Sequence, residues 1–180
     1  EAGRRAAGAS SHDSVLYLAA RVLLHAGDAD GLVEIALRLE DKLQSQTAAL
    51  AGLLRGERAL IEDRMPEAVR TLRDAWKEYD FWFAHFLLGR AYFEVGHLPE
   101  ALDELDLCVR RQGEITDAFL VDSATLRHFP PALYWLGRTQ EAMGSREAAV
   151  ELYRRYLDLR GEGDAADPLV DDARTRADLG

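Results

Sequence analysis

The sequence lacks several features, and each shortage excludes a class of protein. A single cysteine among 180 residues excludes an internal disulfide framework and any zinc site built from several thiolates. No apolar run approaches the roughly 18 residues of a membrane-spanning helix, so we expect no membrane insertion of this segment. Lysine and arginine number 22 against 32 aspartates and glutamates, a net charge of -10. Such an acidic balance argues against a nucleic-acid partner.

Sequence signatures of catalysis are also missing. The five histidines are scattered, and no two of them have the spacing of four residues that a helical metal site needs. The short glycine cluster Gly161-Glu162-Gly163 carries a carboxylate, which makes it a poor phosphate cradle. No nucleophile elbow or Cys/His signature is present. We therefore expect no enzymatic activity, no metal and no cofactor.

The stretch from Trp82 to Gly113 has the clearest pattern in the chain. It predicts two amphipathic helices, and Gly96 and Pro99 mark the turn between them. Gly89 lies seven residues before Gly96, and Ala101 and Cys108 follow Gly89 by twelve and nineteen residues. A small residue within the first helix lets the second helix approach, and Ala101 is expected to be the small contact that faces it. Cys108 is expected to be a core residue.

The same offsets recur three more times along the chain. Ala20, Gly56 and Gly137 each begin a copy of the pattern. Asp63 takes the turn position of the second copy, where the other copies have glycine. Gly56 and Gly89 are 33 residues apart, which is close to the period of about 34 residues of one known class of helical repeat.

The motif carried by Leu88, Gly89, Tyr92, Gly96 and Ala101 resembles the tetratricopeptide repeat. The resemblance implies an all-α fold, a right-handed superhelical solenoid of about four helix-turn-helix units with a C-terminal capping helix. The expected organisation is a flexible lead-in over residues 1–14, an array over 15–163 and a capping helix over 164–180. The expected units lie near residues 13–46, 49–81, 82–115 and 130–163.

An insertion separates the last two units. Gly89 and Gly137 are 48 residues apart, so about fourteen residues exceed one repeat. The insertion over 114–129 is rich in apolar side chains, among them Phe119, Leu120 and Phe129. Burying each such side chain is worth roughly 1.5 to 3 kcal/mol, so we expect the insertion to fold back onto the array. Insertions in repeat proteins often lie on a binding face.

A narrower resemblance covers less than half of the chain. The runs LDLCVRRQGE, FLVDSATLRHFPPALYWLGRTQEAMG and DPLVDDARTRADL resemble the C-terminal repeat region of bacterial multidomain signalling proteins that carry a serine/threonine kinase domain. The resemblance implies a scaffold or sensor region, because no kinase motif is present in these residues. A cytoplasmic location is favoured, and an extracytoplasmic part of a membrane-anchored parent is the alternative.

The first helices of the repeats carry the candidate site. The residue after the central small position is Arg21, Arg90 or Arg138 in three units and Glu57 in the second. Equivalent positions in stacked repeats align, so three arginines would form a row that could take an acidic peptide. The expected partner-binding groove comprises Tyr17, Arg21, Leu53, Phe83, Phe86, Arg90, Phe93, Tyr134 and Arg138.

Three alternatives stay open at this point. The arginines could pair with neighbouring carboxylates and bind nothing. The chain could instead be a self-assembly element that forms homo-oligomers through its insertion or its degenerate first repeat. It could also be a small-molecule sensor whose pocket walls are Phe83, Phe86, Phe119 and Tyr134. The leading hypothesis is a protein-protein interaction module that binds a peptide or protein surface.

Overall fold

The computed structural model describes residues 1–114, 129–160 and 168–178, and every regular element in these ranges is a helix. The predicted all-α fold built from helix-turn-helix units is confirmed. The chain divides into two compact units, Glu1–Leu87 and Leu88–Gly180. The division falls within helix α6 (Trp82–Glu94).

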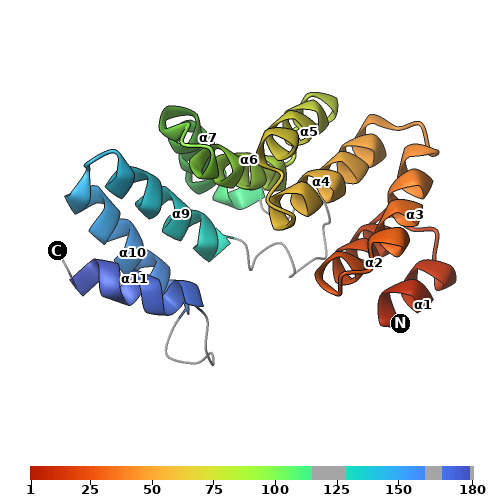
Figure 1. Ribbon diagram of the computed structural model, residues 1–180, viewed down its shortest axis with the longest axis horizontal. Helices are drawn as coiled ribbons and strands as arrows, with labels where there is room; N and C mark the ends of the chain where they lie inside the picture. Colours follow the sequence, from red (N-terminus) through yellow and green to blue (C-terminus); the bar gives the residue numbers. More distant parts are fainter. Residues whose placement is uncertain (115–128, 161–167, 179–180) are drawn as a thin grey trace. The chain divides into compact units, whose positions relative to one another are not determined.

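The first unit consists of α1 to α5 and the beginning of α6. The bounds are α1 (Ala2–Ala9), α2 (Asp13–His25), α3 (Ala29–Glu40), α4 (Ser45–Ile61) and α5 (Met65–Glu78). Each of these five helices packs against its neighbour in the chain, and α2 also packs against α4 (Figure 1). The contact between α2 and α4 brings equivalent positions of these two helices together.

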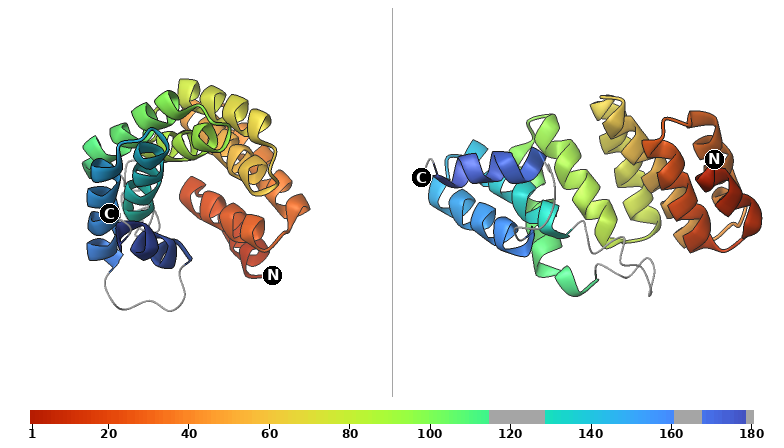
Figure 2. Two further views of the ribbon diagram at one scale, coloured as in Figure 1. Left: turned by 60° about the vertical axis from the view of Figure 1, so that its left-hand side comes forward. Right: turned by 90° about the horizontal axis from the view of Figure 1, so that it is seen from below.

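The second unit contains the rest of α6, then α7 (Leu98–Arg110), a short 3-10 turn (Gln112–Glu114), α9 (Phe129–Ala142), α10 (Arg146–Arg160) and α11 (Pro168–Asp178). Helix α9 packs against α7 and α10, and α11 lies along α10 (Figure 2). The buried side chains of α9, α10 and α11 form one hydrophobic cluster with three tyrosines, Tyr134, Tyr153 and Tyr156.

The predicted turn positions share one backbone geometry. Gly27, Gly96 and Gly144 have φ of +74°, +77° and +85°, and Asp63 adopts φ of +58° at the equivalent place. At each turn the amide of the next residue bonds back across the end of the helix, as from Arg64 N to Ala59 O at 2.8 Å. This is the Schellman arrangement, which needs a left-handed residue. Asp is one of the few non-glycine residues that adopt it at small cost.

The glycines within the first helices allow close helix contact, and the nearest side chain at each is a large one. A Cβ at Gly89 would lie 2.5 Å from Leu105 Cγ, and one at Gly137 would lie 2.8 Å from the Tyr153 ring. Gly56 meets Leu72 at the same offset. Ala101, the small residue predicted to face Gly89, is fully buried one turn before Leu105. In each pair, the large side chain of the second helix fills the space that the missing side chain of the glycine leaves.

Gly52 offers a direct test of this close packing. A Cβ at Gly52 would lie 2.7 Å from Ala75 Cβ, which cannot move without its backbone. We expect Gly52→Ala to lower the free energy of unfolding by about 1–3 kcal/mol through overpacking, measured by urea denaturation. Gly8→Ala is the control, because its Cβ would meet nothing within 4 Å and should stabilise by about 0.4–1 kcal/mol. Equal effects at both sites would contradict the proposed contact.

The N-terminal residues differ from the expected flexible lead-in. Residues Ala2–Ala9 form helix α1, which packs against α2 with Gly3 in contact with Leu23. The guanidinium of Arg4 donates two hydrogen bonds of 2.6 Å to Asp28, and Arg38 donates to the carbonyl oxygen of Ala7. The small residues of α1 include no large apolar side chains from which a helix could be predicted. They nevertheless suit a helix that packs closely against α2 and is stabilised by ion pairs.

Candidate functional site

Two arginines and two aromatic side chains interleave on helices α6 and α9 within the second unit. The Cζ atom of Arg90 lies 5.1 Å from the centre of the Trp135 ring, and that of Arg138 lies 5.4 Å from the centre of the Phe93 ring. The Phe93 and Trp135 rings meet edge to face at 5.5 Å. All four side chains are half-buried. We call these four residues the arginine–aromatic cluster.

The spacing along each helix explains the cluster. Arg90 and Phe93 lie three residues apart on α6, and Trp135 and Arg138 lie three apart on α9, so each pair shares one helix face. The aromatic of one helix faces the arginine of the other in both cases. A guanidinium over a ring face is attracted by the ring quadrupole, which helps to fix its position.

Tyr134 and Asp172 fix the position of Arg138. The Tyr134 hydroxyl donates to Asp172 Oδ2 at 2.7 Å and accepts from Arg138 Nη1 at 2.9 Å. Asp172 Oδ2 lies 3.7 Å from Arg138 Nη1. Arg138 makes no further hydrogen bond within the part of the chain that the structure describes, and its side chain is 27 % exposed. The remaining N–H groups of Arg138 can therefore reach an incoming acceptor.

Burial and hydrogen bonding act together on these groups. Burial, and then the hydrogen bond to Asp172, raise the pKa of Tyr134. Burial alone would raise the pKa of Asp172, but hydrogen bonds from Arg176 and Tyr134 outweigh it and hold that pKa below its ordinary value. Asp172 is consequently ionised at neutral pH, and it balances part of the positive charge of Arg138.

Helix α11 is held to α9 and α10 by a second carboxylate. Glu141 on α9 accepts from Tyr153 at 2.9 Å and also pairs with Arg146 and Arg176. Burial tends to raise the pKa of Glu141, but the hydrogen bonds from Tyr153 and Arg176 lower it overall. Because Arg176 bonds both Glu141 and Asp172, the position of α11 and the position of Arg138 are coupled.

In the first unit the predicted arginine row is interrupted by an ion pair. Arg21 donates from Nε and Nη2 to the two carboxylate oxygens of Glu57 at 3.0 and 2.9 Å, and both residues are buried. The Cζ atom of Arg21 also lies 4.9 Å from the centre of the Phe83 ring. The expectation of an open positive stripe is therefore corrected at Arg21, and the alternative of pairing with a neighbouring carboxylate describes it.

Most of the other predicted groove residues are buried. Tyr17, Leu53, Phe83, Phe86 and Tyr134 are each at most 3 % exposed. Phe119 and Leu120 lie outside the described residues. Phe129 does not belong to the insertion as predicted; it begins helix α9 and packs against the hydrophobic cluster of α9 to α11. Arg90, Phe93 and Arg138 are thus the members of the predicted groove that keep substantial exposure.

Sequence reasoning missed two residues of this site. Trp135 lies three residues before Arg138, the spacing already used to select aromatic side chains, so the same rule could have found it. Asp172 carried no comparable signal, because its role depends on how α11 packs against α9.

The remaining polar candidates have structural roles. Cys108 is fully buried, and burial raises the pKa of its thiol well above the ordinary value, so it acts as a core residue. His85 lies in the interior with its Nε2 2.6 Å from Asp80 Oδ1. The described ranges hold no group of three or more His, Cys, Asp or Glu side chains suited to a metal. None of the described helices is both long and apolar enough to cross a membrane.

Comparison with known proteins supports the repeat class. Residues 131–160, which include most of α9 and all of α10, match the family model of the tetratricopeptide repeat. A solved structure described as YrrB, a TPR protein with an unusual peptide-binding site, is 18% identical and covers 97% of this chain and 98% of that chain, with a TM-score of 0.45. No curated protein matches the chain.

Proposed function

We propose that this chain is a non-catalytic protein-protein interaction module and that its arginine–aromatic cluster receives an acidic peptide segment of a partner. The observation that carries the proposal is Arg138, whose Cζ atom lies over the Phe93 ring, which is hydrogen-bonded to Tyr134 and whose side chain is still 27 % exposed. The tetratricopeptide match over 131–160 supports the wider class, because these repeats serve as interaction surfaces.

The chemistry of the cluster suits a carboxylate flanked by an apolar side chain. A guanidinium whose face is covered by a ring is already desolvated and fixed, so little side-chain entropy remains to be lost when a ligand binds. Its planar edge can bind both oxygens of a carboxylate, which is stronger and more directional than a single bond. Phe93 and Trp135 offer half-buried ring surface beside it. A peptide with an acidic residue next to an apolar one fits both features.

The wider setting follows from the sequence resemblances. Arg90 and Arg138 occupy first helices of their pairs, which in tetratricopeptide arrays line the concave face. The narrower resemblance to the repeat region behind bacterial serine/threonine kinase domains supports a scaffold or sensor role in a larger signalling protein. In that role the partner segment would be bound here while catalysis resides in another domain.

The test measures binding of labelled peptides by fluorescence anisotropy. The probes are fluorescein-labelled peptides with a free C-terminal carboxylate and one further acidic residue beside a leucine, together with amidated glutamine counterparts. We expect only the acidic peptides to bind, and we expect Arg138→Ala to weaken them about tenfold through loss of charge-assisted hydrogen bonds. Arg138→Lys should recover only part of the affinity, because an ammonium cannot bind bidentately.

Arg154→Ala is the matched control. Arg154 is an exposed arginine of α10 in the same unit, so its removal changes the net charge equally. Urea denaturation of each variant shows whether the fold is intact. Equal affinity of the wild type and Arg138→Ala for the acidic peptides would contradict the proposal, as would an equal loss of affinity in Arg154→Ala.

A further inference from the structure

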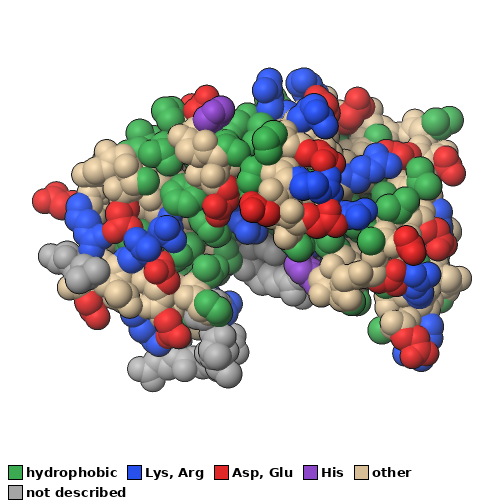
Figure 3. Space-filling model, viewed as in Figure 1, with side chains coloured by type: hydrophobic (Ala, Val, Ile, Leu, Met, Phe, Trp, Pro, Cys, Tyr) green, Lys and Arg blue, Asp and Glu red, His purple; other side chains and the backbone are tan. Residues whose placement is uncertain are grey.

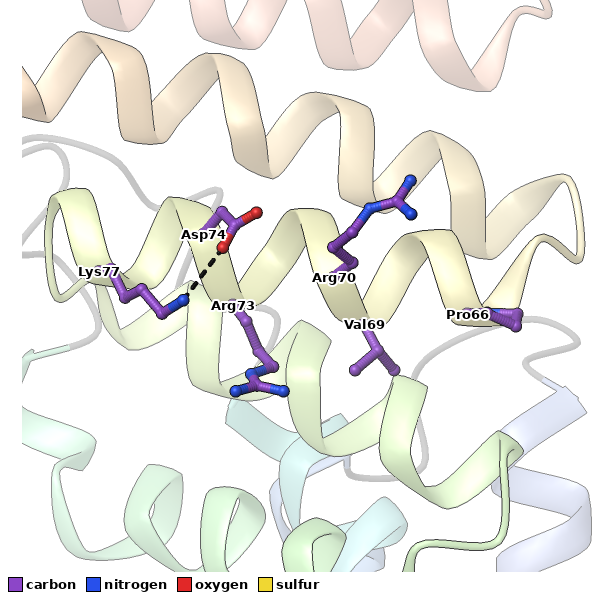
Figure 4. A pocket seen from close by; sticks show the side chains of 6 residues that line it. All are labelled: Pro66, Val69, Arg70, Arg73, Asp74 and Lys77. Carbon is purple, nitrogen blue, oxygen red and sulfur yellow. Dashed lines mark hydrogen bonds and ion pairs between the residues drawn. The ribbon is translucent and has the colours of Figure 1, made fainter.

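Helix α5 of the first unit carries a surface pocket that the sequence reasoning did not single out. The pocket has a volume of about 360 Å³ and is lined by Pro66, Val69, Arg70, Arg73, Asp74 and Lys77. In Figure 4, Arg73 and Val69 project from one side of α5, and Arg70 and Asp74 project from the other. Lys77 lies at one end of the pocket and Pro66 at the opposite end. Cations therefore border the pocket on both sides.

The two arginines of this pocket differ from the other arginines nearby. Arg55, Arg58 and Arg64 each pair with a glutamate. Arg70 and Arg73 are exposed and make no hydrogen bond or ion pair within residues 1–114, 129–160 and 168–178.

The nearest acidic side chains are already engaged. Glu67, one turn before Arg70, pairs with Arg64, and Asp74 accepts from Lys77 at 3.2 Å. Figure 3 shows several Lys and Arg side chains gathered at the top of that view, over α5. In a chain with a net charge of -10, Arg70 and Arg73 thus lie together at this pocket without an ion-pair partner among the described residues.

We infer that this face of α5 is a second docking surface and that its occupant is an acidic, helical segment of a partner protein. Residues 70, 73 and 77 span about 10 Å along the helix at 1.5 Å per residue. Carboxylates placed one turn apart on a partner helix have a spacing of about 6 Å and can face these cations in succession. Val69 and Pro66 supply apolar contact at the same surface.

Charge complementarity favours a peptide over a nucleic acid at this place. A phosphate backbone needs an extended basic surface, and this pocket has three cations with Asp74 among them. The net charge of the chain would repel such a polyanion at longer range. A short acidic segment avoids most of that repulsion because it contacts only the pocket. The pocket on α5 and the arginine–aromatic cluster share no residue, so binding at each can be tested independently.

The test uses the full chain in an Arg138→Ala background, so that binding at the arginine–aromatic cluster does not contribute. The probe is a fluorescein-labelled, alanine-rich helical peptide with three glutamates about one turn apart, and its glutamine counterpart serves as the reference. Binding is measured by fluorescence anisotropy at about 50 mM and about 300 mM NaCl. We expect saturable binding of the glutamate peptide that weakens as salt shortens the Debye length.

The decisive variant is Arg70→Glu/Arg73→Glu, which should weaken the glutamate peptide about tenfold or more, because two favourable charge contacts become unfavourable. The matched control is Arg154→Glu/Arg155→Glu, an exposed arginine pair on α10 that changes the net charge by the same amount. The control should change affinity by about twofold at most. Three results would overturn the inference: absence of saturable binding, equal loss in both variants, or binding of a labelled RNA oligonucleotide in preference to the peptide.

Discussion

Glu57→Ala is expected to lower the free energy of unfolding by about 3–5 kcal/mol, the cost of removing one partner from a buried ion pair. Arg21 and Glu57 are only 4 % and 6 % exposed, and the variant removes two charge-assisted hydrogen bonds of 2.9 and 3.0 Å. The guanidinium would then lie in the interior without the carboxylate that balances its charge. Urea denaturation followed by circular dichroism gives the change as a shift of the midpoint at constant slope.

An exposed ion pair of the same kind provides the control. Arg55 on α4 binds Glu40 on α3 through both terminal nitrogens, but the two side chains are 44% and 35% exposed. Arg55→Ala should therefore cost about 0–1 kcal/mol. The double variant Arg21→Met/Glu57→Leu should recover most of the loss, because well-packed apolar side chains often replace a buried pair without penalty. A loss in Glu57→Ala no larger than that in Arg55→Ala would contradict this account.

The turns of the repeats could be predicted from sequence because local backbone geometry determines them. A left-handed residue is needed wherever the Schellman bond ends a helix, and glycine or aspartate at a fixed offset signals that need. Gly27, Asp63, Gly96 and Gly144 all have positive φ as the offsets require. No knowledge of tertiary packing is needed for such a position.

The side-chain partners were harder to predict because they depend on burial. Arg21 and Glu57 occupy equivalent positions in neighbouring repeats, so the repeat pattern already implies that their side chains lie close together. The predicted arginine row has Glu57 at the position of the second repeat. A buried arginine and glutamate in neighbouring repeats form an ion pair, because water is excluded from them. The sequence pattern predicts which positions of neighbouring repeats lie next to each other. The burial of each arginine, which the pattern does not predict, determines whether it can bind a partner.

Helix α1 shows a different limit of sequence reasoning. It consists of alanine, glycine and arginine, so it has none of the large apolar side chains by which an amphipathic helix is usually identified in a sequence. The helix instead uses close approach at Gly3 and an ion pair from Arg4 to Asp28. These two contacts link residues that are 20 and 24 positions apart in sequence, so they follow no local period.

Ala173→Glu is the other substitution with a large expected effect, a loss of about 3 kcal/mol in the free energy of unfolding. Ala173 is fully buried on α11 and belongs to the cluster that contains Tyr134, Tyr153 and Tyr156. A glutamate there would bring an unpaired charge against the aromatic rings, so α11 should detach from α9 and α10. The loss of stability cannot exceed the free energy that the packing of α11 contributes, because detachment of α11 alone relieves the clash.

Two measurements separate detachment of α11 from general unfolding. Hydrogen exchange should lose protection over α11 first, while α4 and α5 keep theirs. Peptide binding at the arginine–aromatic cluster should weaken as well, because Asp172 would no longer hold Tyr134 and Arg138. Thr175→Glu is the control: it adds the same charge at an exposed position of α11 and should cost less than about 0.5 kcal/mol. If Ala173→Glu left both α11 protection and peptide affinity unchanged, α11 would have no part in positioning the site.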